Sequence, residues 1–340
     1  QMCIRDRYNG GKIKLGYLSP DFRSHAVGRL IHDIFPHHNK DQFEIYCYSL
    51  VDIPKDDIQQ KIKRQDVHFE DVSKLSFEAA AKKINGDGIH VLIDLGGYTT
   101  YTKPEIVALQ PAEIQLQYMG NPDSMEADFI QYIIADKVLL GPAMRNKTNQ
   151  QIIDLKTAFV ASKMETPTVE LTKTDCGLPK NAFVFCCFNL PTKITPGVWR
   201  SWLNILKQVE NGVLWLFSTD EAIKINLKNQ AERAGINPAR VHFADKAPYD
   251  VYLQRLGVAD IFLDTFLYNA GSTCVDALRM NLPVLTMPGK TYASRMGASI
   301  LTAYGMPEMV CENAANYENM AISLARNPGE LAALKDKMVT

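Results

Sequence analysis

Residues 262–278 read FLDTFLYNAGSTCVDAL, and this stretch passes from a strand pattern to a helix pattern within a few residues. The apolar run at 258–266 predicts a buried strand, and the run at 274–280 predicts a helix. Gly271 lies in the turn between them. A buried strand that leads directly into a helix is the repeating unit of α/β folds.

The turn before this helix contains Gly271, Ser272 and Thr273. The first N–H groups of a helix lack intrahelical partners and the helix dipole is positive there, so a phosphate group suits this position. Gly271 would let a phosphate approach the backbone, and the two hydroxyl groups would add donors. Alternatively, the segment is a plain turn in which Ser272 or Thr273 caps the helix. The sequence leaves both interpretations open.

The same alternation of strands and helices runs along most of the chain. Apolar runs predict strands at 12–19, 43–50, 67–73, 90–97, 114–119, 183–189, 212–218, 241–245, 261–266 and 283–288. Helix patterns lie at 26–38, 56–64, 76–88, 104–110, 196–209, 221–235, 250–259 and 272–280, and residues 129–140 read as a helix followed by a strand. This order is typical of parallel sheets covered by helices on both faces, so the predicted fold class is α/β.

A chain of 340 residues is too long for one compact core, which predicts two domains. The polar segment 141–180 is the predicted linker between a Rossmann-like domain at 12–140 and a second one at 181–340. Residues 1–11 fit neither domain and are expected to be a non-native or disordered start, and the C-terminal end is expected to be truncated. Two domains of this kind bind ligands in a cleft lined by the carboxyl ends of their strands.

Composition narrows the classes of partner. A net charge of −1 argues against a nucleic-acid or membrane-surface partner, and no apolar run approaches the ~20 residues that a membrane span needs. The seven cysteines are scattered without zinc or disulfide spacing, which favours a reduced, cytoplasmic protein. The chain contains no P-loop motif, no GxGxxG after its first strand and no paired-carboxylate metal motif. The expected chemistry is therefore independent of a metal ion.

Three further loops follow predicted strands. Lys193, in the loop at 188–197, could neutralise a diphosphate, although most surface lysines are simply solvated. His25, in the loop at 16–30, is a candidate for acid–base catalysis or donor contact, although a lone histidine is usually structural. The glycine-bearing loop at 94–102 could approach a sugar or an acceptor, or could be only a tight turn.

Four blocks of the sequence together resemble a known family. They are KIKLGYLSPDFRSHAVGRL at 12–30, the block from HVLIDLGGYTTYT to IIADKV at 90–138, the block from FVFCCFNLPTK to GVLWL at 183–216, and the block from ADIFLDTF to MGASIL at 259–301. In this order they resemble the catalytic region of O-GlcNAc transferases, glycosyltransferase family 41, including its bacterial Spindly-like members. The resemblance covers about residues 12–335.

The resemblance implies a GT-B fold, in which two Rossmann-like domains face each other across a cleft. It also implies inverting, metal-independent transfer of N-acetylglucosamine from UDP-GlcNAc to serine or threonine hydroxyls of proteins. The donor is a substrate, so no cofactor is expected. Tetratricopeptide repeats are expected in the full-length chain.

The resemblance also assigns roles to individual positions. His25 and Lys193 take the positions of the family's catalytic loop histidine and diphosphate lysine. Donor-binding positions fall on His90, Ala247, Tyr252, Gly271, Ser272, Thr273 and Asp276. Among the last set, Ala247 and Tyr252 would contact the uracil, Asp276 would hold the ribose hydroxyls, and Ser272 and Thr273 would bind the phosphates. Gly271 stands where many animal members have histidine, and Tyr249 stands where they have a lysine near the nucleoside.

Two other classes of function remain open from the sequence. One is a related protein glycosyltransferase that uses GDP-fucose or UDP-glucose. The other is a non-catalytic module that keeps the fold and only binds peptide or nucleotide.

Overall fold

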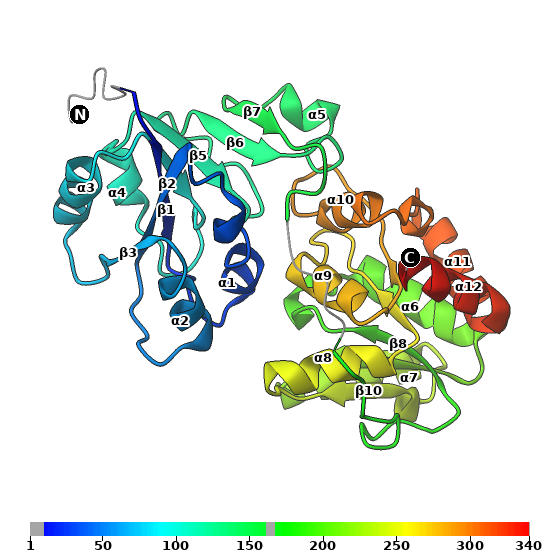
Figure 1. Ribbon diagram of the computed structural model, residues 1–340. Coiled ribbons are helices and arrows are strands. Elements are labelled where there is room, and N and C mark those ends of the chain that lie inside the picture. The colour runs from blue at the N-terminus through cyan, green and yellow to red at the C-terminus, as the bar shows by residue number, and fades with distance from the viewer. Residues whose placement is uncertain (1–9, 161–166, 340) are drawn as a thin grey trace. The chain divides into compact units, whose positions relative to one another are not determined.

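The computed structural model describes residues 10–160 and 167–339, and the chain divides into two compact units, Gln1–Lys163 and Met164–Thr340 (Figure 1). We call these the first and the second unit. Each contains a parallel sheet with helices on both faces, as the alternation of strand and helix patterns predicts. The expected non-native start at 1–11 falls almost entirely outside the described residues.

The first unit is built on a seven-stranded parallel sheet with the order β3-β2-β1-β4-β5-β6-β7. The strands are β1 (Ile13–Ser19), β2 (Phe43–Ser49), β3 (His68–Asp71), β4 (Val91–Asp94), β5 (Ile114–Tyr118), β6 (Tyr132–Ala135) and β7 (Gln151–Asp154). Neighbouring strands are in register from Ile13 opposite Phe43 in β1 and β2, and from Leu15 opposite Val91 in β1 and β4.

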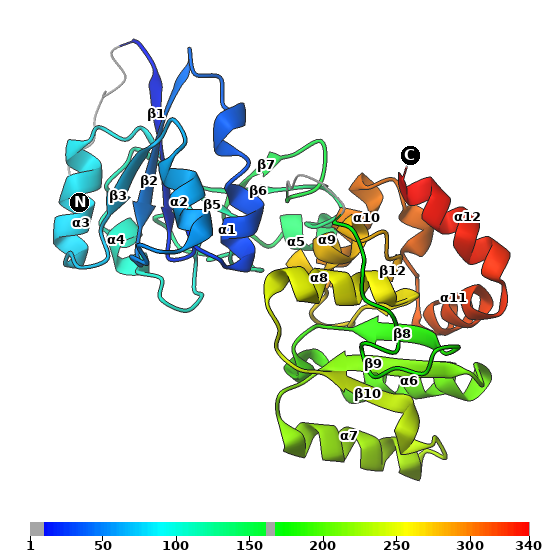
Figure 2. The same ribbon diagram turned by 60° about the horizontal axis from the view of Figure 1, so that its bottom comes forward.

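Helices cover both faces of the first sheet. They are α1 (Ala26–Ile31), α2 (Asp57–Lys63), α3 (Phe77–Gly86), α4 (Pro104–Ala108) and α5 (Pro142–Arg145). Helices α1 and α2 lie on one face and α3 and α4 on the other (Figures 1 and 2). On the second face, Ala80 and Ile84 of α3 and Ile106 of α4 pack in one buried cluster with Leu18 and Leu92 of the sheet.

The structure corrects three local expectations in this unit. Residues 129–140, predicted as a helix followed by a strand, form strand β6 at Tyr132–Ala135 and then a turn. The segment predicted as a linker from residue 141 begins instead with α5 and with β7, and β7 pairs in parallel with β6 as the edge strand of the sheet. The helix predicted at 26–38 ends at Ile31 and is followed by a short 3-10 turn at Phe35–His37. Pro36 lies inside that turn and cannot donate the backbone hydrogen bond that a continuing helix requires.

The second unit is built on a five-stranded parallel sheet with the order β10-β9-β8-β11-β12. The strands are β8 (Phe183–Cys187), β9 (Gly212–Phe217), β10 (Val241–Ala244), β11 (Ile261–Leu263) and β12 (Val284–Leu285). Strands β8 and β11 are buried along almost their whole length, because helices cover both faces. Cys186 and Cys187, adjacent on β8, are both buried, one toward each face.

Seven helices complete the described part of the second unit. They are α6 (Pro196–Gln208), α7 (Glu221–Arg233), α8 (Tyr249–Val258), α9 (Ser272–Arg279), α10 (Met296–Ala303), α11 (Ala314–Arg326) and α12 (Pro328–Val339). Helices α6 and α7 cover one face of the sheet, and α8 and α9 cover the other (Figure 2). Helix α6 starts at Pro196 because the Thr195 side chain accepts a hydrogen bond from the N–H of Val198 and the proline needs no partner of its own.

The two sheets share one strand order. In the first unit the order in which strands are added to the sheet reverses between β1 and β4, and in the second it reverses between β8 and β11, while all strands stay parallel. Ligands of open parallel sheets bind outside the carboxyl ends of the strands at this switch point. The loops that follow β1, β4, β8 and β11 are therefore the places where a functional site is expected.

Candidate active site

The loops after β8 and β11 meet at the switch point of the second sheet. The ammonium of Lys193 donates a hydrogen bond to the backbone carbonyl of Asn269 over 3.2 Å, across 76 positions of sequence. The same ammonium lies 3.5 Å from the ring centroid of Tyr268, a cation–π contact. Burial lowers the pKa of Lys193, and the nearby Asp264 carboxylate acts against that shift. The lysine is thus held in the loop and is not a solvated surface side chain.

Asp264 follows β11 and is fully buried. Its Oδ1 accepts hydrogen bonds from the N–H of Thr265 at 2.8 Å and from the N–H of Ala270 at 2.7 Å. Its Oδ2 accepts one from the hydroxyl of Thr286 at 2.7 Å. Burial raises the pKa of Asp264 to about 6, because the penalty for a buried charge exceeds the stabilisation by these donors.

Asn189 joins the β8 loop to the same carboxylate. Its side-chain amide donates to Asp264 Oδ1 at 3.2 Å and to the hydroxyl of Thr265 at 2.9 Å. Thr265 in turn donates to the carbonyl of Tyr268. We call Asn189, Lys193 and residues 264–273 the strand-end cluster.

Helix α9 begins at the edge of the strand-end cluster. Its N-cap is Gly271, and no side chain caps it, so the interpretation of Ser272 or Thr273 as the capping residue is wrong. The N–H groups of Ser272 and Thr273 make no hydrogen bond with any residue that the structure describes. A Cβ at Gly271 would meet no atom closer than the sulfur of Met296 at 3.4 Å, so the approach to the helix end is open. The position retains the donors that an anion would use.

A second group of candidate residues lies beside α9. Tyr249, the first residue of α8, donates a hydrogen bond from its hydroxyl to Asp276 Oδ1 at 2.5 Å. Its ring stacks on that of Tyr252 with centroids 5.8 Å apart. Burial raises the pKa of Tyr252, and the Asp276 carboxylate adds to that effect. Ala247 is half-buried and precedes α8 by two residues. Three predicted donor-binding positions, Ala247, Tyr252 and Asp276, therefore lie around one short segment.

In the first unit, His25 is the N-cap of α1, at the end of the loop after β1. Its Nδ1 lies 3.3 Å from Asp21 Oδ2 and 3.3 Å from the N–H of Val27. The two contacts require different tautomers, since Nδ1 must carry the proton to donate to Asp21 and must lack it to accept from Val27. Burial lowers the pKa of His25, with Asp21 acting against the shift and Arg23 adding to it. The ring is therefore neutral at neutral pH, with 42% of the side chain exposed.

The loop after β4 is a tight turn built around Asp94. The carboxylate accepts hydrogen bonds from the N–H groups of Gly96 at 3.0 Å and Gly97 at 2.9 Å, and burial raises its pKa to about 6. Gly97 has φ +54°, and a Cβ there would lie 2.5 Å from that of Asn121. Pro20 of the β1 loop is next to this turn, because a Cβ at Gly96 would meet it at 3.4 Å.

Two large rings project from this turn. Tyr98 is 60% exposed and Tyr101 is 67% exposed, and Tyr101 has φ +66°. The turn is thus ordered by Asp94 and still presents aromatic surface to solvent.

His90 is not part of these strand-end loops. It directly precedes β4, at the amino end of the sheet, and its Nδ1 accepts a hydrogen bond from the N–H of Lys14 at 2.9 Å. His25 lies at the carboxyl end of the neighbouring strand β1. The structure therefore does not bring His90 together with His25, and gives it a contact that joins β1 to β4.

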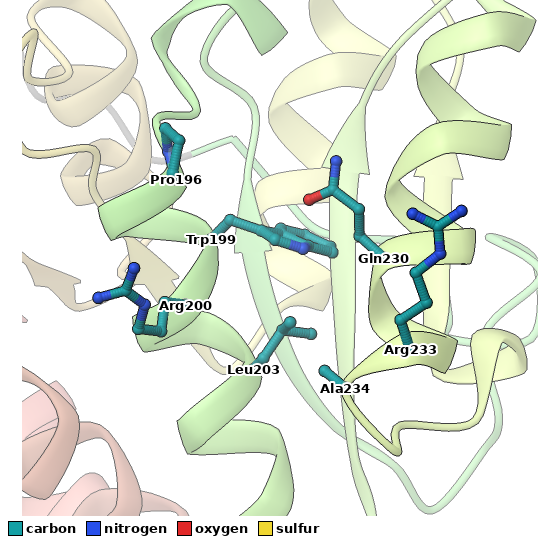
Figure 3. Close-up of a pocket in the computed structure, with 7 residues that line it drawn as sticks. All are labelled: Pro196, Trp199, Arg200, Leu203, Gln230, Arg233 and Ala234. Carbon is teal, nitrogen blue, oxygen red and sulfur yellow. The ribbon is translucent and has the colours of Figure 1, made fainter.

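A shallow groove lies elsewhere in the second unit, between α6 and α7. Its volume is about 340 Å³, and Figure 3 shows the side chains of Trp199 from α6 and of Gln230 and Arg233 from α7 around it. The groove shares no residue with the strand-end cluster. We regard it as a surface feature between two helices that cover the sheet.

Sequence reasoning missed the residues that hold the strand-end cluster together. Asp264, Asn189 and Thr286 are polar and buried, and each lies at or beyond the end of a strand. The one available signal was an aspartate at the end of the apolar run IFLDTF, but a strand-ending carboxylate is as often solvated as buried.

No group of three or more histidine, cysteine, aspartate or glutamate side chains in residues 10–160 and 167–339 gathers as a set of metal ligands. Within the same ranges, no helix has both the length and the apolar character that crossing a membrane requires.

Comparison with known proteins identifies the family to which this chain belongs. The model of the family described as glycosyl transferase family 41 matches residues 3–161 and 140–340. The chain is 33% identical over 335 residues to the probable UDP-N-acetylglucosamine–peptide N-acetylglucosaminyltransferase SEC of Arabidopsis thaliana, covering 96% of this chain and 34% of that protein. It is 29% identical over 334 residues to the SPINDLY protein of the same plant, described by the same activity, covering 95% of this chain and 36% of the relative. The chain thus spans about a third of the length of the curated relatives it matches.

Solved structures give the same answer for the fold. A mutant of the Thermobaculum terrenum O-GlcNAc transferase superposes with a TM-score of 0.88 at 25% identity, covering 98% of this chain and 63% of that one. Anabaena HepE in complex with UDP superposes with a TM-score of 0.62 at 12% identity, covering 96% and 93% of the two chains, and shows likeness of fold alone. These matches confirm the expected GT-B fold class.

Proposed function

Because the chain belongs to glycosyl transferase family 41, we propose that it transfers N-acetylglucosamine from UDP-GlcNAc to serine and threonine hydroxyls of proteins. The transfer inverts the anomeric carbon and needs no metal ion. The observation that carries this proposal is the strand-end cluster, where a half-buried lysine and the uncapped start of α9 lie together. The names of the Arabidopsis relatives supply the donor and the class of acceptor.

The chemical step is a displacement at the anomeric carbon. The acceptor oxygen forms its bond on the face opposite the diphosphate, the bond to the diphosphate breaks, and UDP departs with the electron pair. Negative charge grows on the diphosphate as that bond breaks. The Lys193 ammonium and the N–H groups of Ser272 and Thr273 are fixed donors that stabilise this charge without reorganising. In this proposal they serve the purpose for which many transferases use a divalent cation.

The nucleoside is held by the residues around the start of α8. Asp276 accepts hydrogen bonds from the ribose hydroxyls, Tyr252 stacks on the uracil, and the backbone of Ala247 contacts the uracil edge. Tyr249 donates to Oδ1 of Asp276, and Tyr252 also hydrogen-bonds to this carboxylate, so the two rings hold the group that would bind the ribose. The proposal for this group rests on its position beside α9.

His25 is the proposed base or positioning residue for the acceptor hydroxyl. A base needs a free lone pair on Nε2, so the tautomer with the proton on Nδ1, donated to Asp21, is the productive one. The lowered pKa keeps the ring neutral and able to accept a proton at neutral pH.

The proposal extends to the location and the acceptors of the full-length protein. We place it in the cytoplasm, acting on protein or peptide acceptors that tetratricopeptide repeats elsewhere in the full-length chain would present. The six cysteines in the described residues are all free, which supports a reducing compartment.

Calorimetric titration of the purified chain with UDP and with GDP tests the donor first. Micromolar binding of UDP with weak binding of GDP is the expected result, and a peptide-transfer assay with UDP-GlcNAc then tests the reaction. Preference for GDP would move the donor to GDP-fucose. A folded chain that binds UDP and transfers nothing would be the non-catalytic module, and the proposed activity would fall.

A further inference from the structure

The carboxylate of Asp264 is the centre of the strand-end cluster. It accepts from backbone N–H groups at both ends of the loop, Thr265 and Ala270, and so closes the loop into a ring. Within that ring the carbonyl of Asn269 accepts the hydrogen bond from Lys193. The direction of the lysine side chain therefore depends on a loop whose two ends are joined through one carboxylate.

Surrounding elements leave this carboxylate little freedom. A Cβ at Gly297 of α10 would lie 2.7 Å from Asp264 Oδ2, and only glycine allows that approach. The hydroxyl of Tyr317 on α11 donates to the backbone carbonyl of Asp264 at 3.0 Å and accepts from the indole of Trp202 at 3.1 Å. Residues of α6, α10 and α11 thus restrict the position of the aspartate.

The charge of Asp264 matters as much as its hydrogen bonds. Burial disfavours the charged form of Lys193, and the carboxylate opposes this effect by raising the pKa of the ammonium. Three other titratable groups interact with Asp264, namely Cys187 of β8, Cys274 of α9 and Tyr317 of α11. Burial raises the pKa of each, so they are neutral at neutral pH. Lys193 is then the charged group that faces Asp264 among the described residues.

From this arrangement we propose that Asp264 is a positioning residue, whose charge and closed loop hold the Lys193 ammonium at the start of α9. The contacts among Asp264, the loop and Lys193 do not depend on the proposed function, whereas the role of Lys193 as the lysine that binds the diphosphate rests on it. Asp94 closes a turn from the same position in the first sheet, so turn closure alone does not distinguish Asp264. What distinguishes Asp264 is its interaction with a second charge, the ammonium of Lys193.

The test compares two aspartates at opposite ends of β11. Asp264→Asn removes the charge beside Lys193. Asp260→Asn removes a charge that pairs with Lys173 at 2.8 Å and accepts from the N–H of Val184 at 2.7 Å, at the amino end of the strand. Both variants perturb the packing of the same strand, and only the first removes the charge that faces Lys193.

The readout is the titration of Lys193 itself. The rate at which trace acetic anhydride acetylates Lys193 is measured as a function of pH by mass spectrometry of the digested protein. In Asp264→Asn the midpoint should move down by about one pH unit or more, as for the loss of an opposite charge close to an ionised group. In Asp260→Asn it should stay at the wild-type value. An unchanged midpoint in a folded Asp264→Asn protein would overturn the proposal.

A second variant covers the case in which Asp264→Asn does not fold. Thr286→Val keeps the carboxylate and removes the donor on its Oδ2, which raises the pKa of Asp264 further. The diphosphate of UDP-GlcNAc does not titrate near pH 6. As the pH is lowered and Asp264 becomes protonated, the affinity for UDP-GlcNAc should begin to fall at a higher pH in the variant than in the wild type. If the affinity for UDP-GlcNAc depended on pH in the same way in Thr286→Val and in the wild type, the proposal would be contradicted. If the wild type binds no UDP-GlcNAc, the proposed function fails, and the Lys193 titration still decides the role of Asp264.

Discussion

The two sheets place an aspartate at the same point of their topology, and the two aspartates differ in what surrounds them. Asp94 ends β4 and Asp264 follows β11, so each lies at the carboxyl end of a strand beside the switch point. Both are buried, and burial raises the pKa of each to about 6. The shared position follows from the shared strand order.

Asp94 and Asp264 differ in the residues that surround their carboxylates. Asp94 accepts hydrogen bonds from two backbone N–H groups of a glycine turn. Asp264 accepts from two backbone N–H groups and also from the side chains of Thr286 and Asn189, and it faces Lys193. One strand end is therefore a capped turn that carries exposed tyrosines, and the other is a charged cluster at an uncapped helix. In the proposed function, only the second strand end binds an anion, because only there do a cation and the start of a helix lie beside the aspartate.

The largest expected effect is that of Lys193→Ala. Loss of one donor to developing charge typically costs roughly 2.7–4 kcal/mol of barrier, so turnover should fall about 10²–10³-fold. UDP-GlcNAc turnover with a peptide acceptor measures this, with Lys207→Ala on the exposed side of α6 as the control. Near-normal turnover would remove the lysine from the mechanism and leave the two strand ends alike.

Asp94→Asn tests the first unit by its stability against pH. The pKa of Asp94 is about 6 in the folded chain and 3.8 ordinarily, so the folded state binds the proton more tightly. This stabilisation is complete only well below pH 3.8 and is lost as the pH rises through about 6. It amounts to about 3 kcal/mol for a pKa difference of about two units. The wild type should therefore lose about 2 kcal/mol more of its unfolding free energy than the variant between pH 4 and 7.

Urea unfolding at several pH values measures the effect in each unit. All three tryptophans, Trp199, Trp202 and Trp215, belong to the second unit, so their fluorescence reports that unit while circular dichroism reports both. Asp94→Asn should change the dichroism transition and leave the fluorescence transition in place. A joint shift of both transitions would show that the two units unfold as one.

Gly97→Ala and Gly271→Ala form a matched pair of smaller changes. Gly97 has φ +54° and its Cβ would lie 2.5 Å from Asn121, so the substitution should cost about 1–3 kcal/mol of stability. Gly271 has φ −98° and no contact below 3.4 Å, so the cost there should be at most about 1 kcal/mol. UDP affinity should fall in Gly271→Ala, because the methyl group lies where the phosphate approaches. Equal losses of stability would show that the two turns are under the same constraint.

The smallest expected effect is that of His90→Ala. The ring accepts a hydrogen bond from the N–H of Lys14, and the loss of such a bond costs about 1 kcal/mol of stability. Turnover should stay within about threefold of wild type, because His90 lies at the amino end of the first sheet and not among the loops at the carboxyl ends of its strands. A loss of turnover at unchanged stability would return His90 to the donor site.

Much of the candidate site could be predicted because its parts are local or carried by the resemblance. Gly271 and the start of α9 appear as a strand-to-helix turn in 262–278, and Lys193 lies in a loop directly after a predicted strand. The capping of α9 could not be predicted, because Gly271, Ser272 and Thr273 are all acceptable N-cap residues. Which of them caps depends on the backbone angles that the loop after β11 imposes.

By itself, the sequence determined the fold class, the division into two similar halves and the family, because hydrophobic periodicity and motif order are written along the chain. Tertiary structure alone decided that β7 joins the first sheet, that Asp264 is buried and that Lys193 meets Asn269. These contacts join residues far apart in sequence. They depend on which strands become neighbours at the switch point, and local patterns do not encode that choice.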